Sequence, residues 1–79
     1  MKIVIYGRPG CHLCDEAGDQ IRAITAGMDG VTIETVDIES DDGLMRRYLE
    51  RIPVVEAGGE EVSELVFDPG PLRVRLGIA

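Results

Sequence analysis

The stretch KIVIYGRPGCHLC, residues 2–14, decides the fold because it joins a predicted strand to a helix start that carries two cysteines. Residues 3–5 are consecutive and apolar, as expected of a strand whose two faces are covered in a parallel sheet. Residues 7–10 predict a turn, and a helix is expected to begin at Cys11 or at the residue after it. Cys11 and Cys14 therefore lie in the first turn of a helix that directly follows a strand.

The chain after Cys14 predicts one strand–helix–strand unit and then a smaller second half. An apolar stripe at helical spacing marks the face of the first helix that is expected to be buried, and Gly27 or Gly30 is expected to end that helix. The stripe consists of Leu13, Ala17, Ile21, Ile24 and Met28. Residues 31–38 are rich in β-branched side chains and predict a second strand, parallel to the first.

The second half begins with a helix-start signal at residues 40–42, and Pro53 stops that helix. Gly58 and Gly59 form a hairpin signal between predicted strands at 54–57 and 61–67. Asp68 and Pro69 then suit an N-cap and the first position of a short final helix. The sequence thus predicts a single α/β domain over residues 1–79, with the order β-α-β-α-β-β-α and a four-stranded mixed sheet flanked by helices on both faces.

Composition and charge limit the kinds of molecule that the chain is expected to bind. The formal net charge is −7, from 15 acidic and 8 basic residues, so nucleic acid is an unfavourable partner because phosphate contacts need clustered basic groups. Residues 1–6 are too short for the apolar core of a signal peptide, and no apolar run approaches the ~18 residues of a membrane helix. We therefore expect a cytoplasmic monomer that does not contact a membrane.

The Cys11-His12-Leu13-Cys14 motif carries the chemistry. Residues three apart on a helix have Cβ atoms roughly 5–6 Å apart, so these cysteines can form a disulfide without distorting the backbone. Free N–H groups and the helix dipole stabilise a thiolate at a helix N-terminus. Cys11 is nearer those donors and is expected to be the attacking thiol, while Cys14, one turn in, is expected to resolve the mixed disulfide.

Two other interpretations of the cysteine pair stay open. Structural zinc needs four ligands, and this chain supplies only Cys11, Cys14 and the adjacent His12, so a zinc-binding module would have to share its site between two chains. A non-catalytic adaptor that retains the cysteines is the other alternative.

Charged residues near the motif act on the Cys11 thiolate in opposite directions. Asp15 and Glu16, which follow the motif, disfavour the thiolate through like-charge repulsion, whereas Arg8 favours it.

Together, the cysteine motif and Arg51-Ile52-Pro53 before the third predicted strand make the chain resemble the glutaredoxin family, in particular its short branch with C-x-L-C motifs. The resemblance extends from about Lys2 to Leu76 and implies a thioredoxin-like fold. It also implies that Pro53 is cis and lies beside the cysteines, and that the backbone of Ile52 pairs with an extended thiol substrate. Arg8 and Arg51 correspond to positions where family members hold basic groups near a substrate carboxylate.

The chain also departs from the family pattern. Glutaredoxins commonly have Pro-Tyr between their cysteines, where this chain has His12-Leu13. They place Gly-Gly before the last helix, where it approaches glutathione, and this chain has residues 66–69, Val-Phe-Asp-Pro, there. The activity that we expect is thiol–disulfide exchange through Cys11 and Cys14, without a metal or an organic cofactor. The expected substrates are a protein disulfide or a low-molecular-weight thiol.

Overall fold

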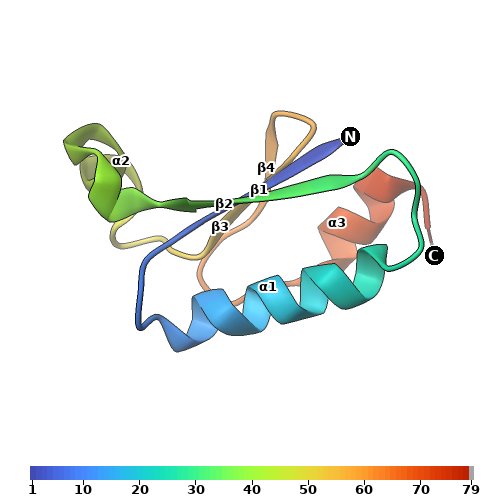
Figure 1. Ribbon diagram of the computed structural model, residues 1–79, viewed down its shortest axis with the longest axis horizontal. Coiled ribbons are helices and arrows are strands. Elements are labelled where there is room, and N and C mark those ends of the chain that lie inside the picture. Colours follow the sequence, from blue (N-terminus) through green and yellow to red (C-terminus); the bar gives the residue numbers. More distant parts are fainter. Residues whose placement is uncertain (79) are drawn as a thin grey trace.

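The structure, a computed structural model, describes residues 1–78 as three helices packed on one four-stranded sheet (Figure 1). The predicted order of elements is confirmed, with one short 3-10 helix added after the second strand. In chain order the elements are β1 (Lys2–Gly7), α1 (His12–Thr25), β2 (Thr32–Asp37), η1 (Ile38–Ser40), α2 (Asp42–Tyr48), β3 (Val54–Ala57), β4 (Glu60–Ser63) and α3 (Pro69–Leu76).

The sheet has the strand order β2-β1-β3-β4, so β1 lies in the interior. β1 runs parallel to β2 and antiparallel to β3, which makes the sheet mixed, as predicted. β3 and β4 form an antiparallel hairpin, and Gly58 and Gly59 turn it with φ angles of 60° and 86°. Positive φ at both positions of a two-residue turn explains why glycine stands there.

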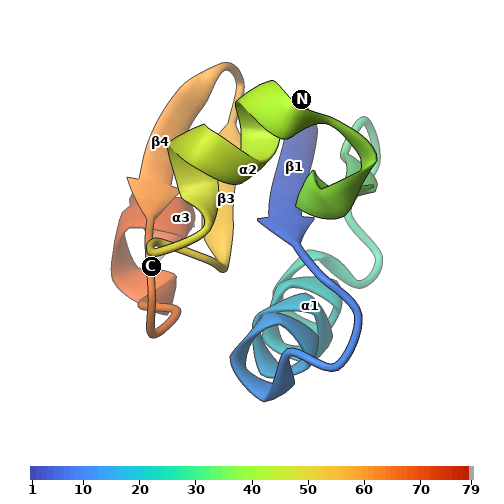
Figure 2. The same cartoon turned by 90° about the vertical axis from the view of Figure 1, so that its left-hand side faces the viewer.

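Two faces of the sheet bury different helices, because successive residues of a strand point to opposite sides. Ile5 and its partner Val55 face α1 and α3, which lie together on one side of the sheet (Figure 2). The core on this side consists of Ile3, Ile5, Ala17, Ile21, Val55, Ala57, Phe67 and Leu72. The next pair along, Tyr6 and Val54, faces α2 on the opposite side.

α2 packs on its side of the sheet through a small apolar cluster that includes two stacked aromatic rings. The rings of Tyr6 and Tyr48 are stacked with centroids 4.4 Å apart, and Ile38 and Val54 are fully buried beside them. The Tyr6 hydroxyl donates to a carboxylate oxygen of Glu56 at 3.4 Å. Burial, together with the negative charge of Glu56, raises the pKa of Tyr6. The prediction of helices on both faces of the sheet is therefore confirmed.

One predicted core residue is in fact exposed. Leu13 keeps 41% of its accessible surface, although its spacing had placed it on the buried stripe of α1. Ala17 and Ile21 are buried as predicted, together with Cys14, Gly18 and Thr25, so the inward position of the first turn belongs to Cys14. Helix periodicity is compatible with a buried stripe that begins at Leu13 or at Cys14, and the packing of Cys14 determines that it is the buried one.

Some element ends also differ from the prediction. The strand predicted over 61–67 ends at Ser63, where its hydroxyl accepts a hydrogen bond from the Asp68 amide at 3.1 Å. The intervening residues leave the sheet and Phe67 turns into the core. The first helix ends at Thr25, and Gly27 follows its C-cap with a φ angle of 77°, as expected of a helix-stop glycine. β2 is one residue shorter at each end than residues 31–38. Among residues 1–78, no helix has the length and apolarity needed to cross a bilayer.

The packing of α3 on the core is tested by replacing Leu72, which is fully buried. We expect Leu72→Ala to lower the free energy of unfolding by about 2–5 kcal/mol, because it leaves a cavity among the core side chains. Val74→Ala, on the same helix but 79% exposed, is the matched control and is expected to change it by less than about 0.5 kcal/mol. Equal losses in urea unfolding would show that α3 does not dock through Leu72.

Candidate functional site

The candidate site is the disulfide between Cys11 and Cys14 at the start of α1. Their Cα atoms are 5.2 Å apart, within the range that a disulfide requires. Cys11 is the N-cap of α1, and its sulfur accepts a hydrogen bond from the backbone N–H of Cys14 at 3.1 Å. The first sulfur therefore lies against the free donors of a helix N-terminus, which are the groups that stabilise negative charge.

The two sulfurs differ in accessibility. Cys11 is partly exposed, whereas Cys14 keeps 9% of its accessible surface and packs toward the sheet. His12, Asp15 and Glu16 are exposed around them. A substrate that approaches from solvent thus meets Cys11 first, and Cys14 lies behind it.

Gly7, the last residue of β1, makes room for the buried sulfur. A Cβ atom at this position would lie 2.9 Å from Cys14 Sγ, closer than real Cβ contacts, and 3.0 Å from Cys14 Cβ. The end of the interior strand and the first turn of α1 can meet at this distance only because residue 7 has no side chain. Sequence reasoning had treated Gly7 only as part of a turn, because its packing partner is seven residues away.

The predicted cis proline is present at the same end of the sheet. The Ile52–Pro53 bond is cis, and Pro53 is fully buried. Val54, the next residue, pairs with Tyr6, and Tyr6 precedes the glycine that contacts Cys14. This chain of contacts brings the Pro53 loop to the same end of β1 as the disulfide. Within residues 1–78, neither the N–H nor the C=O of Ile52 has a hydrogen-bond partner.

The two predicted substrate-binding arginines are each paired with an acid of the protein itself. Arg8 forms an ion pair with Glu39 at 3.1 Å, and Arg51 forms one with Glu64 at 2.6 Å and another with Glu61. Hydrogen bonds to Glu64 and Glu61 raise the pKa of Arg51. Each guanidinium group thus has a carboxylate partner within the same chain.

Arg51 also fixes the loop that follows β4, a role that sequence reasoning missed. Its carbonyl accepts a hydrogen bond from the Leu65 amide at 2.9 Å, while its side chain holds Glu64. Its guanidinium carbon also lies 5.6 Å from the Tyr48 ring centroid. Residues 64–65 are therefore bound to the residue that precedes Ile52-Pro53, and no local pattern in the sequence marks a contact across thirteen positions.

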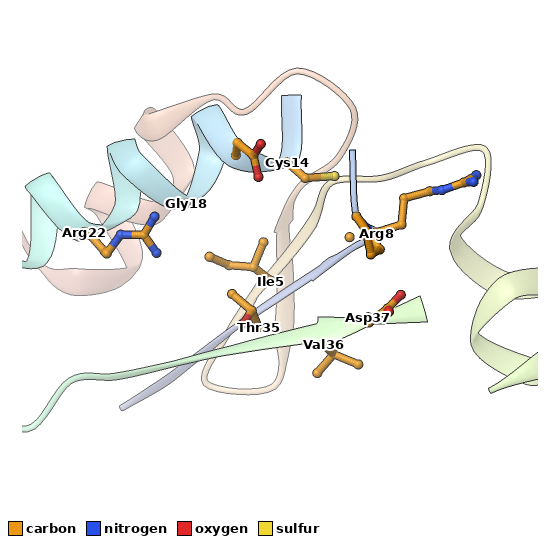
Figure 3. Close-up of a pocket in the computed structure, with 11 residues that line it drawn as sticks. Ile5, Arg8, Cys14, Gly18, Arg22, Thr35, Val36 and Asp37 are labelled. Atoms are coloured by element: carbon orange, nitrogen blue, oxygen red, sulfur yellow. The ribbon is translucent and has the colours of Figure 1, made fainter. Parts of the chain in front are cut away.

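A cavity of about 360 Å³ reaches Cys14 from the side of β2 (Figure 3). Ile5 and Gly18 contribute to its walls, and Arg8, Arg22 and Asp37 lie around it. This volume is enough for several water molecules beside Cys14. Among residues 1–78, no three His, Cys, Asp or Glu side chains group closely enough to hold a metal ion.

Comparison with known proteins covers almost the whole chain. The family model described as Glutaredoxin-like domain (DUF836) matches residues 2–76, from β1 to the end of α3. The solution NMR structure of protein Ne2328 from Nitrosomonas europaea is similar, with 30% identity, a TM-score of 0.80 and coverage of 94% of this chain and 88% of that chain. The X-ray structure of structural-genomics target protein XcR50 from X. campestris is 33% identical, with a TM-score of 0.76 and coverage of 98% and 97%. No curated protein matches the chain.

The close approach of β1 to the disulfide gives a test by addition of one methyl group. We expect Gly7→Ala to lower the free energy of unfolding of the oxidised protein by about 1–3 kcal/mol, because the new Cβ overlaps the Cys14 side chain. Gly18→Ala is the control and is not expected to lower this free energy. Its new Cβ meets only the flexible guanidinium of Arg22, at 3.2 Å, and alanine is more favourable than glycine in a helix by about 1 kcal/mol. A Gly7→Ala protein as stable as the wild type in urea would refute this packing.

Proposed function

The chain belongs to the glutaredoxin-like domain family, and on that premise we propose that it is a thiol–disulfide oxidoreductase acting through Cys11 and Cys14. The observation that carries the proposal is the asymmetry of the pair. Cys11 is accessible and caps α1, where donors favour its thiolate, while Cys14 is buried within bonding distance. An attacking thiol and a resolving thiol need this arrangement.

The exchange proceeds in two displacement steps. The Cys11 thiolate of the reduced protein attacks one sulfur of a substrate disulfide, forms a mixed disulfide and releases the other substrate sulfur as a thiolate. The Cys14 thiolate then attacks Cys11 Sγ, closes the disulfide described above and releases the second substrate thiolate, and both released thiolates take up protons. The substrate gains two electrons, and the Cys11–Cys14 dithiol loses two.

Two features near the cysteines support these steps. In this proposal the N–H and C=O of Ile52, which have no hydrogen-bond partner among residues 1–78, pair with an extended substrate backbone. The cavity beside Cys14 has room for water next to a thiol that must lose its proton before it attacks. The exchange itself requires no metal and no organic cofactor.

The oxidised pair must be returned to the dithiol before another turnover. A low-molecular-weight thiol, used twice, or a reductase supplies the two electrons. We place this cycle in the cytoplasm, where thiols are kept reduced. There the chain transfers electrons between thiols and disulfides and so contributes to cell redox homeostasis. The acting unit is a monomer, because one chain contains both thiols.

The roles of the two cysteines are tested by trapping the mixed disulfide. Incubated with a small uncharged disulfide such as hydroxyethyl disulfide, Cys14→Ser is expected to accumulate a stable adduct on Cys11, because no resolving thiol remains. The matched Cys11→Ser protein, whose remaining thiol is buried, is expected to react at least ~10-fold more slowly, a difference of about 1.4 kcal/mol in activation free energy. Mass spectrometry of both proteins over time gives the rates. Equal rates would contradict the assignment of Cys11 as the attacking thiol.

A further inference from the structure

The cavity beside Cys14 gives the disulfide a second approach, separate from the exposed side of Cys11. Cys14 belongs to its lining, and Cys11 does not. The cavity lies between α1 and β2, is partly open to solvent, and has a volume of about 360 Å³ (Figure 3). Pockets of about 300–1,000 Å³ are typical of small-molecule sites. A small molecule in this cavity would therefore contact the disulfide at Cys14 and not at Cys11.

Two small residues keep this cavity open. Gly18 is a buried residue of α1 and contributes no side chain to the wall. Thr35 of β2 is the parallel partner of Ile5, and both side chains point toward α1 (Figure 3). Thr35 is exposed on an edge strand, so it covers the cavity only in part. A large side chain at position 35 would project into the cavity and fill it.

The two sulfurs of the disulfide are not equivalent as targets of a thiolate. A thiolate attacks one sulfur and expels the other, and a sulfur leaves faster when its thiolate is better stabilised. Attack on Cys14 Sγ expels Cys11, which caps α1 and accepts a hydrogen bond from the Cys14 amide at 3.1 Å. Attack on Cys11 Sγ would instead expel Cys14, which is buried. The better leaving group is therefore expelled by a molecule that attacks from the cavity.

Asp37 stands where an amine on such a molecule would lie. It is the parallel partner of Gly7, the residue whose missing side chain makes room for Cys14. Its carboxylate accepts a backbone hydrogen bond at the start of η1, at 2.9 Å, and has no ion pair within residues 1–78. The guanidinium groups at the cavity, those of Arg8 and Arg22, are already paired with carboxylates, at 3.1 and 2.9 Å. A thiolate approaching Cys14 thus meets a negative charge, which an ammonium group on the same molecule offsets.

We propose that a small thiol carrying an ammonium group enters this cavity and reduces the oxidised protein by attack on Cys14 Sγ. This inference rests on the oxidoreductase function proposed above and names the class of its reductant and the sulfur that the reductant attacks.

The reduction takes two molecules of the thiol. The thiolate of the first forms a bond to Cys14 Sγ, while the Cys11–Cys14 bond breaks and Cys11 leaves as a thiolate. The thiolate of the second attacks the sulfur of the first in this mixed disulfide and expels the Cys14 thiolate. The two thiols together lose two electrons and become a disulfide, the cysteine pair gains the two electrons, and the two protons that the thiols lost pass to Cys11 and Cys14.

The first test compares three small thiols of similar size as reductants of the oxidised full-length protein. Cysteamine carries an ammonium group, 2-mercaptoethanol is uncharged, and 3-mercaptopropionate carries a carboxylate. The rate with each thiol, followed by acid quenching, alkylation and mass spectrometry, is divided by the rate of the same thiol with dipyridyl disulfide, which corrects for intrinsic reactivity. We expect the corrected rate to be about tenfold higher for cysteamine than for 3-mercaptopropionate, the effect of one charge a few ångströms away near a protein surface.

The charge beside Cys14 is tested by one variant and a matched control. Asp37→Asn keeps an oxygen that can cap η1 and removes the negative charge. It is expected to lower the ratio of the cysteamine rate to the 3-mercaptopropionate rate by about threefold or more. Asp29→Asn, in the turn between α1 and β2, makes the same change in net charge and is expected to leave the ratio unchanged.

The route through the cavity is tested by filling it. Thr35→Phe is expected to lower the cysteamine rate about tenfold, because the ring occupies the space that the thiol must enter. Thr32→Phe is the control, since residue 32 lies three positions away on the same strand and points to the opposite face of the sheet. Circular dichroism shows whether each variant keeps the fold, and Asp37→Asn tests the inference independently of that result.

The sulfur that is attacked is identified from the mixed disulfide. Oxidised protein mixed with cysteamine is quenched in acid within milliseconds and alkylated, and tandem mass spectrometry locates the adduct. We expect the adduct on Cys14 and the alkyl group on Cys11. Adducts on Cys11 alone, or equal corrected rates for the three thiols, would overturn this inference and keep the oxidoreductase. No reduction by any thiol, together with no adduct on Cys11 in the trapping experiment with Cys14→Ser, would overturn both.

Discussion

The contact between Gly7 and Cys14 is the constraint on which the rest of the site depends. It allows the C-terminal end of the interior strand β1 to touch the first turn of α1, so that Cys14 becomes part of the helix face that packs on the sheet. With Cys14 turned inward, Cys11 is left at the N-cap and Leu13 faces solvent. One missing side chain therefore creates both the asymmetry of the thiols and the apolar residue between them.

A second constraint comes from Arg51, whose charge is used within the fold. Its side chain pairs with Glu61 and Glu64, and its carbonyl binds the Leu65 amide, so the loop after β4 is fixed to the segment before Pro53. A guanidinium held by two carboxylates has little attraction left for a substrate anion. The same guanidinium that the family resemblance suggested for a substrate carboxylate thus has partners within the fold.

Much of this architecture could be predicted from the sequence because its signals are local. The apolar run at residues 3–5, the Gly58-Gly59 turn, the Asp68 cap and the C-x-x-C spacing each act over a few residues, and each was placed correctly. The parts that could not be predicted are contacts between distant segments. The neutralisation of Arg8 and Arg51, the contact of Gly7 with Cys14 and the early end of β4 depend on partners that only the folded chain brings together. The positive φ angle of Leu65, 62°, belongs to the same class, since no local rule places leucine there.

The central claim is that Cys11 and Cys14 form a reversible redox couple, and the most direct measurement is their redox equilibrium. The purified protein would be equilibrated in a graded series of thiol–disulfide buffers, and the state of the pair read by alkylation and mass spectrometry. We expect one reversible transition that involves two electrons and is absent in Cys11→Ser. A pair that stays reduced in every buffer, or that resists alkylation because it holds zinc, would contradict the account and favour a metal-binding module.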